Sequence, residues 1–195
     1  MTSTRLARLI SDGLNPLVIG LIILALLSFD TTSSASEALK WFFLVVGLCF
    51  LPVLVIAMFL VKTGRMDALF SNRRHQRHRI YVIGLFFNVL AMLTLTWMHA
   101  PAALIAALVA GLASVVSFAF INLWWKISVH ASIASALVVI LHLLFGWWAI
   151  PALILVPIMG WSRIKLAQHT LGQVAAGSAL SAVIVIAVFF QYGVI

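Results

Sequence analysis

Long apolar stretches constrain this chain more than any other feature of its sequence. Several approach or exceed the ~20 residues that an α-helix needs to cross about 30 Å of hydrocarbon. Within lipid, every backbone N–H and C=O group must be satisfied inside the protein, which leaves helices or closed barrels. The apolar runs are continuous and do not alternate with polar residues, and 65% of the 195 residues are hydrophobic. The sequence therefore predicts an all-α, polytopic transmembrane helical bundle of six to seven membrane helices.

The hydropathy pattern favours seven crossings, which make residues 1–195 a single membrane domain. The predicted helices cover residues 13–29, 41–62, 80–98, 101–123, 127–146, 148–161 and 170–192. The sixth is short, and its length also fits a partly interfacial position. The stretch Asp30–Lys40, rich in Ser and Thr, is the one clearly polar loop expected on the far side. The first helix is longer than the usual apolar region of a signal peptide, so we expect it to be retained.

Basic residues gather on one predicted side of the membrane. With seven crossings, that side carries eleven of the twelve Lys and Arg residues, namely Arg5, Arg8, Lys62, Arg65, Arg73, Arg74, Arg77, Arg79, Lys126, Arg163 and Lys165. Lys40 alone lies opposite. Short loops rich in Lys and Arg stay on the cytoplasmic side. The sequence thus predicts an integral multi-pass protein, expected in the cell membrane, with its basic face toward the cytoplasm.

Acidic residues are scarce, which excludes some classes of membrane enzyme. The chain contains four of them, Asp12, Asp30, Glu37 and Asp67, and no two share a motif. Enzymes that hold Mg²⁺ against a lipid diphosphate need clustered carboxylates. A membrane prenyltransferase and a metal-dependent alcohol-phosphate transferase are therefore disfavoured. The single cysteine, Cys49, lies in an apolar run and is expected to be an inert buried thiol.

Three polar islands interrupt the apolar sequence, and all three fall on the basic face. They are residues 71–79, residues 126–130 and residues 162–173. A basic run beside a membrane helix usually sets topology or binds lipid headgroups. Ionisable groups at membrane depth are costly, however, so three islands on one face point to a function. Four other histidines have bland interpretations: His75 and His78 in a solvated basic loop, and His99 and His142 as satisfied polar residues.

The third island carries a recognisable pattern. Ser162-Arg163, followed by five residues and then His169, resembles the third signature of the type 2 phosphatidic acid phosphatase superfamily. That superfamily includes lipid phosphatases and vanadium haloperoxidases. Ser128-Val129-His130 is similar to its second signature, Pro-Ser-Gly-His.

The first island looks like a degenerate form of the first signature, a Lys and an Arg-Pro seven residues apart. The order of the motifs and the pair of helices between them also fit. The resemblance covers roughly residues 60–190, which would form a phosphatase-like core.

The resemblance implies a role for each matching residue. His169 would be the nucleophile that takes the phosphoryl group, and His130 the acid that protonates the leaving alcohol. Gln173 stands where the family has the Asp that orients the nucleophile. The phosphate oxygens would be held by Arg163, Ser128, Ser162, Lys126, backbone amides near Val129, and Arg73 or Arg77. The substrate would be a phosphorylated lipid among the membrane lipids. The reaction would need no metal and no cofactor, and no nucleic acid is expected as a partner.

The chemistry of the same residues favours this interpretation independently. Arginine forks suit phosphate oxygens, and imidazole can act as nucleophile or acid near neutral pH. Ser128 is placed like an N-cap, so the helix that follows would direct its amides and its positive dipole end at an anion. If a helix starts near His169, Gln173 lies one turn on and can reach the imidazole ring.

Two alternatives remain open. Gln173, Val129 and the broken first motif also fit a catalytically weak or inactive relative that binds anionic lipid phosphate. An amide can fix the tautomer of His169, but it cannot offset positive charge on a phosphorylated ring. A transporter or channel has less support, because the charged residues cluster at one interface and no inverted repeat is evident.

Overall fold

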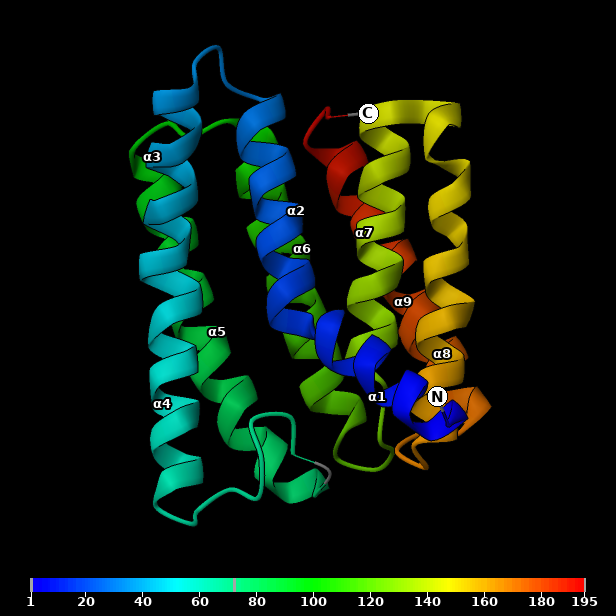
Figure 1. The fold of residues 1–195 in the computed structure, drawn as a ribbon. Helices are drawn as coiled ribbons and strands as arrows, with labels where there is room; N and C mark the ends of the chain where they lie inside the picture. The colour runs from blue at the N-terminus through cyan, green and yellow to red at the C-terminus, as the bar shows by residue number, and fades with distance from the viewer. Residues whose placement is uncertain (1, 72, 195) are drawn as a thin grey trace. The chain divides into compact units, whose positions relative to one another are not determined.

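The computed structural model describes residues 2–71 and 73–194, with the backbone alone at residue 74. Every regular element in the described part of the chain is helical, which confirms the predicted all-α class. Among the described residues, five helices are long and apolar enough to cross a membrane, or six when the bent pair at the amino terminus is included. The chain is thus a multi-pass helical membrane protein (Figure 1).

The helices are numbered in chain order. Their bounds are α1 Ser3–Gly13, α2 Pro16–Asp30, α3 Ala35–Val45, the π-helical segment η1 Val46–Phe50, α4 Leu51–Lys62, α5 Arg74–Trp97, α6 Ala102–Ile121, α7 Val129–Phe145, the 3₁₀ segment η2 Gly146–Ile154, α8 Leu155–Lys165 and α9 Leu171–Gln191.

The chain forms two compact units. We call residues 1–26 and 126–195 the terminal unit, because it contains both ends of the chain, and residues 27–125 the central unit. The predicted phosphatase-like core, residues 60–190, draws on both. Each unit is described below by itself.

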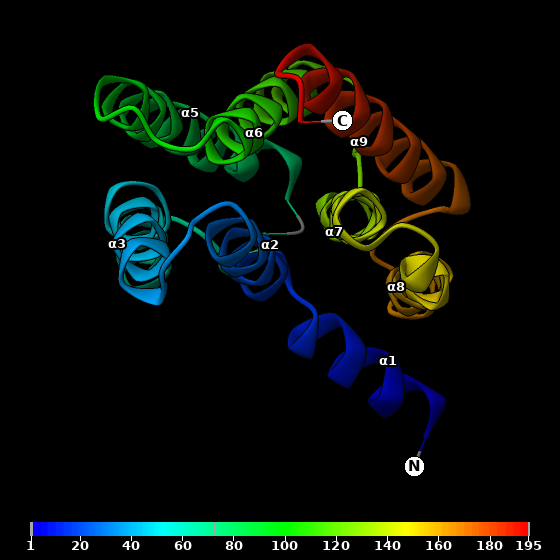
Figure 2. The same cartoon turned by 90° about the horizontal axis from the view of Figure 1, so that it is seen from above.

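In the terminal unit, α7 packs along α9 and against α8, while α8 also contacts α1 and α9. Figures 1 and 2 show α7 and α8 side by side, joined at one end by η2. The helical stretch Val129–Lys165, 37 residues long, therefore reverses direction within itself. Gly146 begins the reversal with a φ of 56°, a left-handed value that glycine adopts without strain. The predicted fifth and sixth helices correspond to α7 and to η2 plus α8.

The amino terminus differs from the prediction of one helix over residues 13–29. Two helices, α1 and α2, meet there at a bend of 45°. Asn15 causes the break, because its side-chain oxygen accepts the N–H groups of Leu17 and Val18 at 3.0 and 3.1 Å and so caps a new helix. Pro16 at the first position of α2 has no N–H to satisfy and suits that place.

In the central unit, α3, η1 and α4 form one continuous helical stretch, Ala35–Lys62. It packs on α5, and α5 packs on α6. The helix begins six residues earlier than predicted, because Ser34 caps it by accepting the N–H of Glu37 at 3.3 Å. The predicted polar loop Asp30–Lys40 is wrong in extent, since residues 31–34 alone separate α2 from α3.

Helix α5 also begins earlier than the predicted residue 80. Its first turns contain most of the first polar island, so the prediction that His75 and His78 lie in a loop is wrong. Arg and Gln are good helix formers although they are not apolar, and a hydropathy boundary therefore misses them. His78 Nε2 lies 3.3 Å from Asn122 Nδ2 at the end of α6, inside the central unit.

Candidate functional site

The second and third polar islands meet at one end of the terminal unit. The backbone N–H of Ser128, just before α7, donates to the carbonyl of Gln173 in α9 at 3.4 Å. The Lys126 ammonium donates to the carbonyl of Gln168 at 2.7 Å. Residues 126–130 and 162–173 thus form one cluster, which we call the polar end.

The close approach of α9 to the start of α7 depends on Gly177. A Cβ atom at this position would lie 2.8 Å from the Ser128 carbonyl oxygen and 2.8 Å from Ser132 Oγ. The Ser132 hydroxyl itself donates to that carbonyl at 2.7 Å. One turn further on, Ser135 Oγ donates to the Ser178 carbonyl at 2.9 Å. Small residues therefore hold the two helices together directly beside the polar end.

Helix α7 begins with the predicted cap. Ser128 has extended backbone angles, and its Oγ accepts the N–H of Ala131 at 3.4 Å. Ser128 is completely buried, and His130, the second residue of the helix, is 5% exposed. The first turn of a helix presents backbone N–H groups without intrahelical partners and the positive end of the dipole. An imidazole therefore lies buried beside a position suited to an anion.

His169 lies before α9, two residues ahead of its first residue, and is 7% exposed. Its Nδ1 is 3.0 Å from Gln173 Oε1, so Gln173 reaches the ring as predicted from the helical spacing. The same Oε1 accepts the backbone N–H of Thr170 at 3.2 Å. The Thr170 hydroxyl in turn accepts the N–H of Gln173 at 3.3 Å, which completes a capping box.

This capping box determines the tautomer of His169. A backbone N–H can only donate, so the Gln173 atom that faces both Thr170 and the ring must be the oxygen. Nδ1 of the neutral ring is then the protonated nitrogen, and the lone pair lies on Nε2. The contact with Gln173 therefore fixes which ring nitrogen of His169 carries the proton.

Arg163, near the end of α8, is 3% exposed and is held on both terminal nitrogens. Nη1 donates to Ser11 Oγ in α1, and Nη2 donates to Gln168 Oε1. The chain turns back after α8 in a Schellman motif, in which the Gln168 N–H donates to the Arg163 carbonyl at 3.1 Å and Ala167 has a φ of 52°. The turn thus brings the Gln168 side chain back to the guanidinium.

Ser162 serves packing between helices. Its side chain is completely buried, and its hydroxyl donates to the Ala7 carbonyl of α1 at 2.6 Å. Its neighbour Arg163 binds the same helix one turn later, at Ser11. The sequence-based prediction included neither Ser11 nor Ala7, and it gave Gln168 of the third island no role of its own. The available signal was the four-residue spacing of small residues in residues 3–13, where charged residues hide the helix from a hydropathy window.

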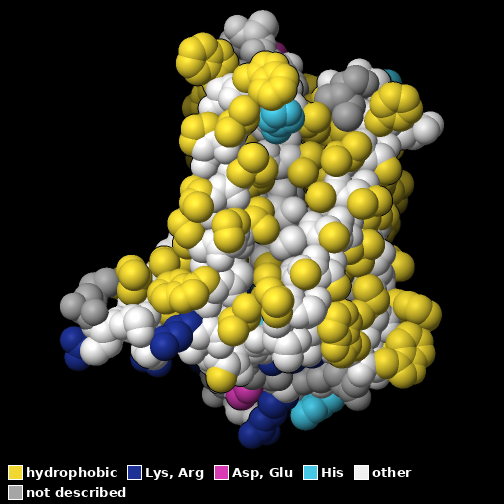
Figure 3. All heavy atoms as spheres, turned by 90° about the vertical axis from the view of Figure 1, so that its right-hand side faces the viewer, with side chains coloured by type: hydrophobic (Ala, Val, Ile, Leu, Met, Phe, Trp, Pro, Cys, Tyr) yellow, Lys and Arg dark blue, Asp and Glu magenta, His cyan; other side chains and the backbone are white. Residues whose placement is uncertain are grey.

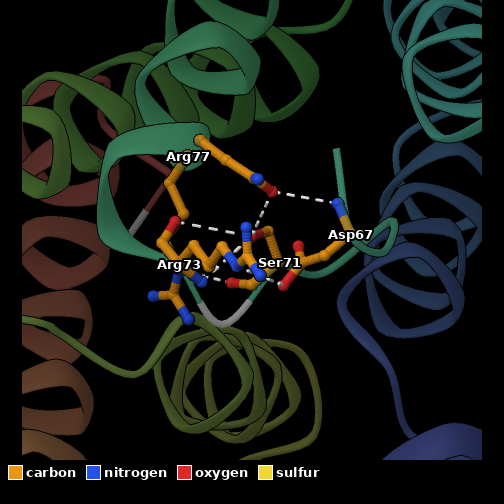
Figure 4. A network of polar contacts seen from close by, with 5 residues as sticks. Asp67, Ser71, Arg73 and Arg77 are labelled. Atoms are coloured by element: carbon orange, nitrogen blue, oxygen red, sulfur yellow. Dashed lines mark hydrogen bonds and ion pairs between the residues drawn. The ribbon is translucent and has the colours of Figure 1, made fainter. Parts of the chain in front are cut away.

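The first polar island lies in the central unit, where its residues contact one another and Asp67 (Figure 4). Arg77 Nε donates to the Ser71 carbonyl at 2.8 Å. Arg73 Nε lies 3.9 Å from an Asp67 carboxylate oxygen, and its side chain is 65% exposed. Gln76 Oε1 accepts from the Asp67 N–H at 2.9 Å and from the Ser71 hydroxyl at 3.0 Å. The placement of Arg73 and Arg77 beside the two histidines stays a prediction.

The remaining two histidines, His99 and His142, lie outside the three polar islands. His99 follows α5 and adopts a φ of 53° in the turn that leads to α6. His142 is exposed near the end of α7 that is remote from Ser128. Its ring lies edge-on to Trp147, with the ring centroids 6.4 Å apart.

The fold and the polar end define a multi-pass helical membrane protein in which two buried histidines and a buried arginine lie on neighbouring segments of one unit. Comparison with protein-family models, with curated proteins and with solved structures finds no match for this chain.

Proposed function

We propose that this protein is a metal-independent membrane phosphatase that hydrolyses a lipid phosphate or a polyprenyl diphosphate through a phosphohistidine intermediate. One observation carries the proposal: the hydrogen bond from the Ser128 N–H to the Gln173 carbonyl joins the segment of His130 to the segment of His169. The packing of α7 on α9 thus brings the two histidine segments together, as a shared phosphate site requires. The proposal also rests on the resemblance of the two motifs to the phosphatase superfamily.

The chemistry proceeds in two transfers. His169 Nε2 attacks phosphorus, and the bond from phosphorus to the lipid oxygen breaks. His130, protonated, donates its proton to that oxygen, and the lipid alcohol (or the shortened phosphate) leaves. His130, now neutral, takes a proton from water, whose oxygen attacks the phosphohistidine. Inorganic phosphate is released, and His169 regains its lone pair.

Positive charge and amide donors would stabilise the phosphoryl group as it moves. Phosphoryl transfer depends on positioning and on electrostatic stabilisation of the spread negative charge. Arg163 carries five N–H donors in one planar group, and its contacts with Ser11 and Gln168 orient that group. The amides at the start of α7 add a second group of donors.

A groove beside the polar end suits the hydrocarbon chain of such a substrate. It lies between α8 and α9, has a volume of about 580 Å³ and is lined mainly by apolar side chains, among them Val156, Trp161, Ile164 and Leu171. Lys165 lines it as well. An ammonium in an apolar groove complements a molecule with a hydrocarbon tail and an anionic head. A phosphorylated lipid has this combination.

The test is phosphate release by purified protein in detergent with EDTA, on phosphatidic acid and on a polyprenyl diphosphate. We expect wild-type protein to release phosphate, His169→Ala to release none above background, and His130→Ala to be slowed about 10²-fold or more because it lacks the general acid. His142→Ala is the matched control, since His142 is a histidine of the same unit outside the polar end.

Acid-quenched wild-type protein should carry acid-labile phosphate on a histidine, and His169→Ala should carry none. Undiminished release by His169→Ala would remove His169 as the nucleophile.

A second candidate function is a protein that binds anionic lipid phosphate without turning it over. Gln173 favours it, because an amide cannot neutralise the positive charge of a phosphorylated ring. In a serine protease, replacing the corresponding carboxylate by an amide slows catalysis by about 10⁴, partly through the tautomer. Here the Thr170 N–H already secures the tautomer, which leaves the charge as the remaining difference.

The orientation in the membrane belongs to the same proposal. In the terminal unit, the polar end carries Lys126, Arg163 and Lys165. In the central unit, Arg79 Nη1 donates to the Arg65 carbonyl at 3.1 Å, so the basic residues after α4 and at the start of α5 gather together. By the positive-inside rule, we place both basic clusters on the cytoplasmic side of the cell membrane.

A further inference from the structure

The amino-terminal helix α1 has two distinct faces. Ala7 and Ser11, one turn apart, are 0% and 3% exposed, and α1 packs on α8. The opposite face exposes Leu6 and Leu9 together with basic side chains. A helix with one docked face and one apolar and basic face is suited to the surface of a bilayer.

The docked face of α1 accepts two hydrogen bonds from the Ser162-Arg163 motif. The Ala7 carbonyl accepts the Ser162 hydroxyl at 2.6 Å, and Ser11 Oγ accepts from Arg163 Nη1. Ser11 and Arg163 are 152 positions apart in sequence and both are buried. Neither contact is local, so the docking of α1 decides both of them.

Gln168 contacts the other terminal nitrogen of the Arg163 guanidinium. Its Oε1 accepts from Arg163 Nη2, its N–H donates to the Arg163 carbonyl, and its own carbonyl accepts from Lys126 at 2.7 Å. A guanidinium is planar, and acceptors on both terminal nitrogens fix the direction of the whole group. Ser11 and Gln168 therefore set the orientation in which Arg163 would meet an anion.

The exposed face of α1 suits the membrane surface. Arg5 and Arg8 are exposed, and Leu6 and Leu9 are 42% and 60% exposed. The following helix, α2, is bent by 45° from α1 and begins an apolar stretch. Figure 3, which views the molecule from the right-hand side of Figure 1, shows hydrophobic side chains over most of that face and Lys and Arg side chains toward its lower edge. Leucines at the headgroup boundary and arginines among anionic headgroups would keep α1 docked.

We infer that α1 is a membrane-surface helix that positions Arg163 for phosphate binding through the Ser11 hydroxyl. The inference rests on the proposed function in that it assigns the bound anion to the phosphate of the substrate. Ser11 is a positioning residue, because its role in binding is exerted through Arg163. An orienting contact prepared before binding lowers the entropy cost of binding and of the transition state.

The test compares three variants of the full chain in detergent: Ser11→Ala, Ser11→Thr and Thr4→Ala. Calorimetry measures the affinity of each variant for inorganic phosphate. Thermal unfolding of each variant is measured in parallel. Removing a hydrogen bond to a charged group should weaken phosphate binding about tenfold in Ser11→Ala. Ser11→Thr keeps the hydroxyl and should restore the affinity. Thr4→Ala removes the hydroxyl of an exposed side chain of the same helix and should behave as wild type.

The outcomes separate this inference from the phosphatase. If lipids release no phosphate but Ser11→Ala still weakens phosphate binding, the positioning role stands and the phosphatase falls. If wild-type protein is active and Ser11→Ala matches it in phosphate affinity and kcat/KM, the positioning role falls. A lower Tm of Ser11→Ala with unchanged phosphate affinity would give Ser11 a structural role alone, and it would also overturn the positioning role. Wild-type protein that binds no phosphate would overturn the positioning role, whatever its activity on lipids.

The surface location has its own measurement. In Leu9→Trp protein, reconstituted in phosphatidylcholine and phosphatidylglycerol vesicles, phospholipids brominated on their acyl chains should quench the new indole, beyond the quenching of the seven native tryptophans. Thr4→Trp is the comparison for the same helix. No additional quenching in Leu9→Trp would show that α1 does not lie on the bilayer.

Discussion

At the scale of single residues, one oxygen atom determines the tautomer of His169, the candidate nucleophile. Gln173 Oε1 accepts both the Thr170 N–H and the Nδ1–H of His169, at 3.2 and 3.0 Å. The amide thus supplies the geometry that a carboxylate would supply, without the charge. Spacing along one helix made this contact predictable, since the residues are four apart and the capping pattern is local.

Gln173→Glu is the sharpest change at this scale, because it keeps the length of the side chain and replaces the amide by a carboxylate. Glu also completes a capping box, so the helix start should persist. We expect kcat for phosphate release to rise at least about tenfold, since the carboxylate stabilises the positive ring. Gln173→Leu, which removes the acceptor, should fall below wild type. No turnover in wild-type protein or in Gln173→Glu, with phosphate binding retained, would favour the binding protein over the enzyme.

At the scale of elements, the polar end depends on how closely α9 approaches α7. The contact has no room for a side chain at Gly177, and the nearest atom is a backbone oxygen that cannot rotate away. Small residues in the last helix predict close helix packing, but a run of Ala, Gly and Ser does not reveal which member meets another helix.

Gly177→Ala should therefore destabilise the protein, although alanine is the better helix former. Overpacking of this kind costs about 1–3 kcal/mol, and Tm in detergent should fall accordingly. Gly84→Ala is the matched control, because Gly84 lies within α5 and a Cβ there meets nothing within 4 Å. Equal Tm values for the two variants would contradict the close packing of α7 and α9.

Element boundaries show where hydropathy alone fails. Helix α5 begins at Arg74 and α1 occupies Ser3–Gly13, and both segments are helical although they are polar or charged. Helix propensity and packing, not apolarity, determine these starts. Ser34 and Ser128 both cap helices, but Glu37 and Lys40 follow Ser34, so hydropathy alone does not mark the helix start there.

At the scale of the whole molecule, the charge distribution predicts the orientation in the membrane. The central unit provides a direct measurement in a Cys49→Ala background, since Ser33 and Ala68 lie in the loops on either side of the helical stretch Ala35–Lys62. On intact cells, a membrane-impermeant maleimide should label Ser33→Cys and leave Ala68→Cys unlabelled until the membrane is opened. The reverse pattern would place the basic clusters outside the cytoplasm.

The sequence by itself determined the features that depend on solvent and on short-range spacing. Continuous apolar runs dictate membrane helices, because lipid leaves the backbone no other partner. Ser128 as a cap and Gln173 against His169 follow from helical geometry within one turn.

Tertiary structure alone decided which distant segments meet. The hydrogen bond between Ser11 and Arg163 and the fit of Gly177 against Ser128 both depend on the packing of helices far apart in the chain. Such contacts are selected by shape and by the pairing of buried polar groups, and neither has a period that a single sequence displays.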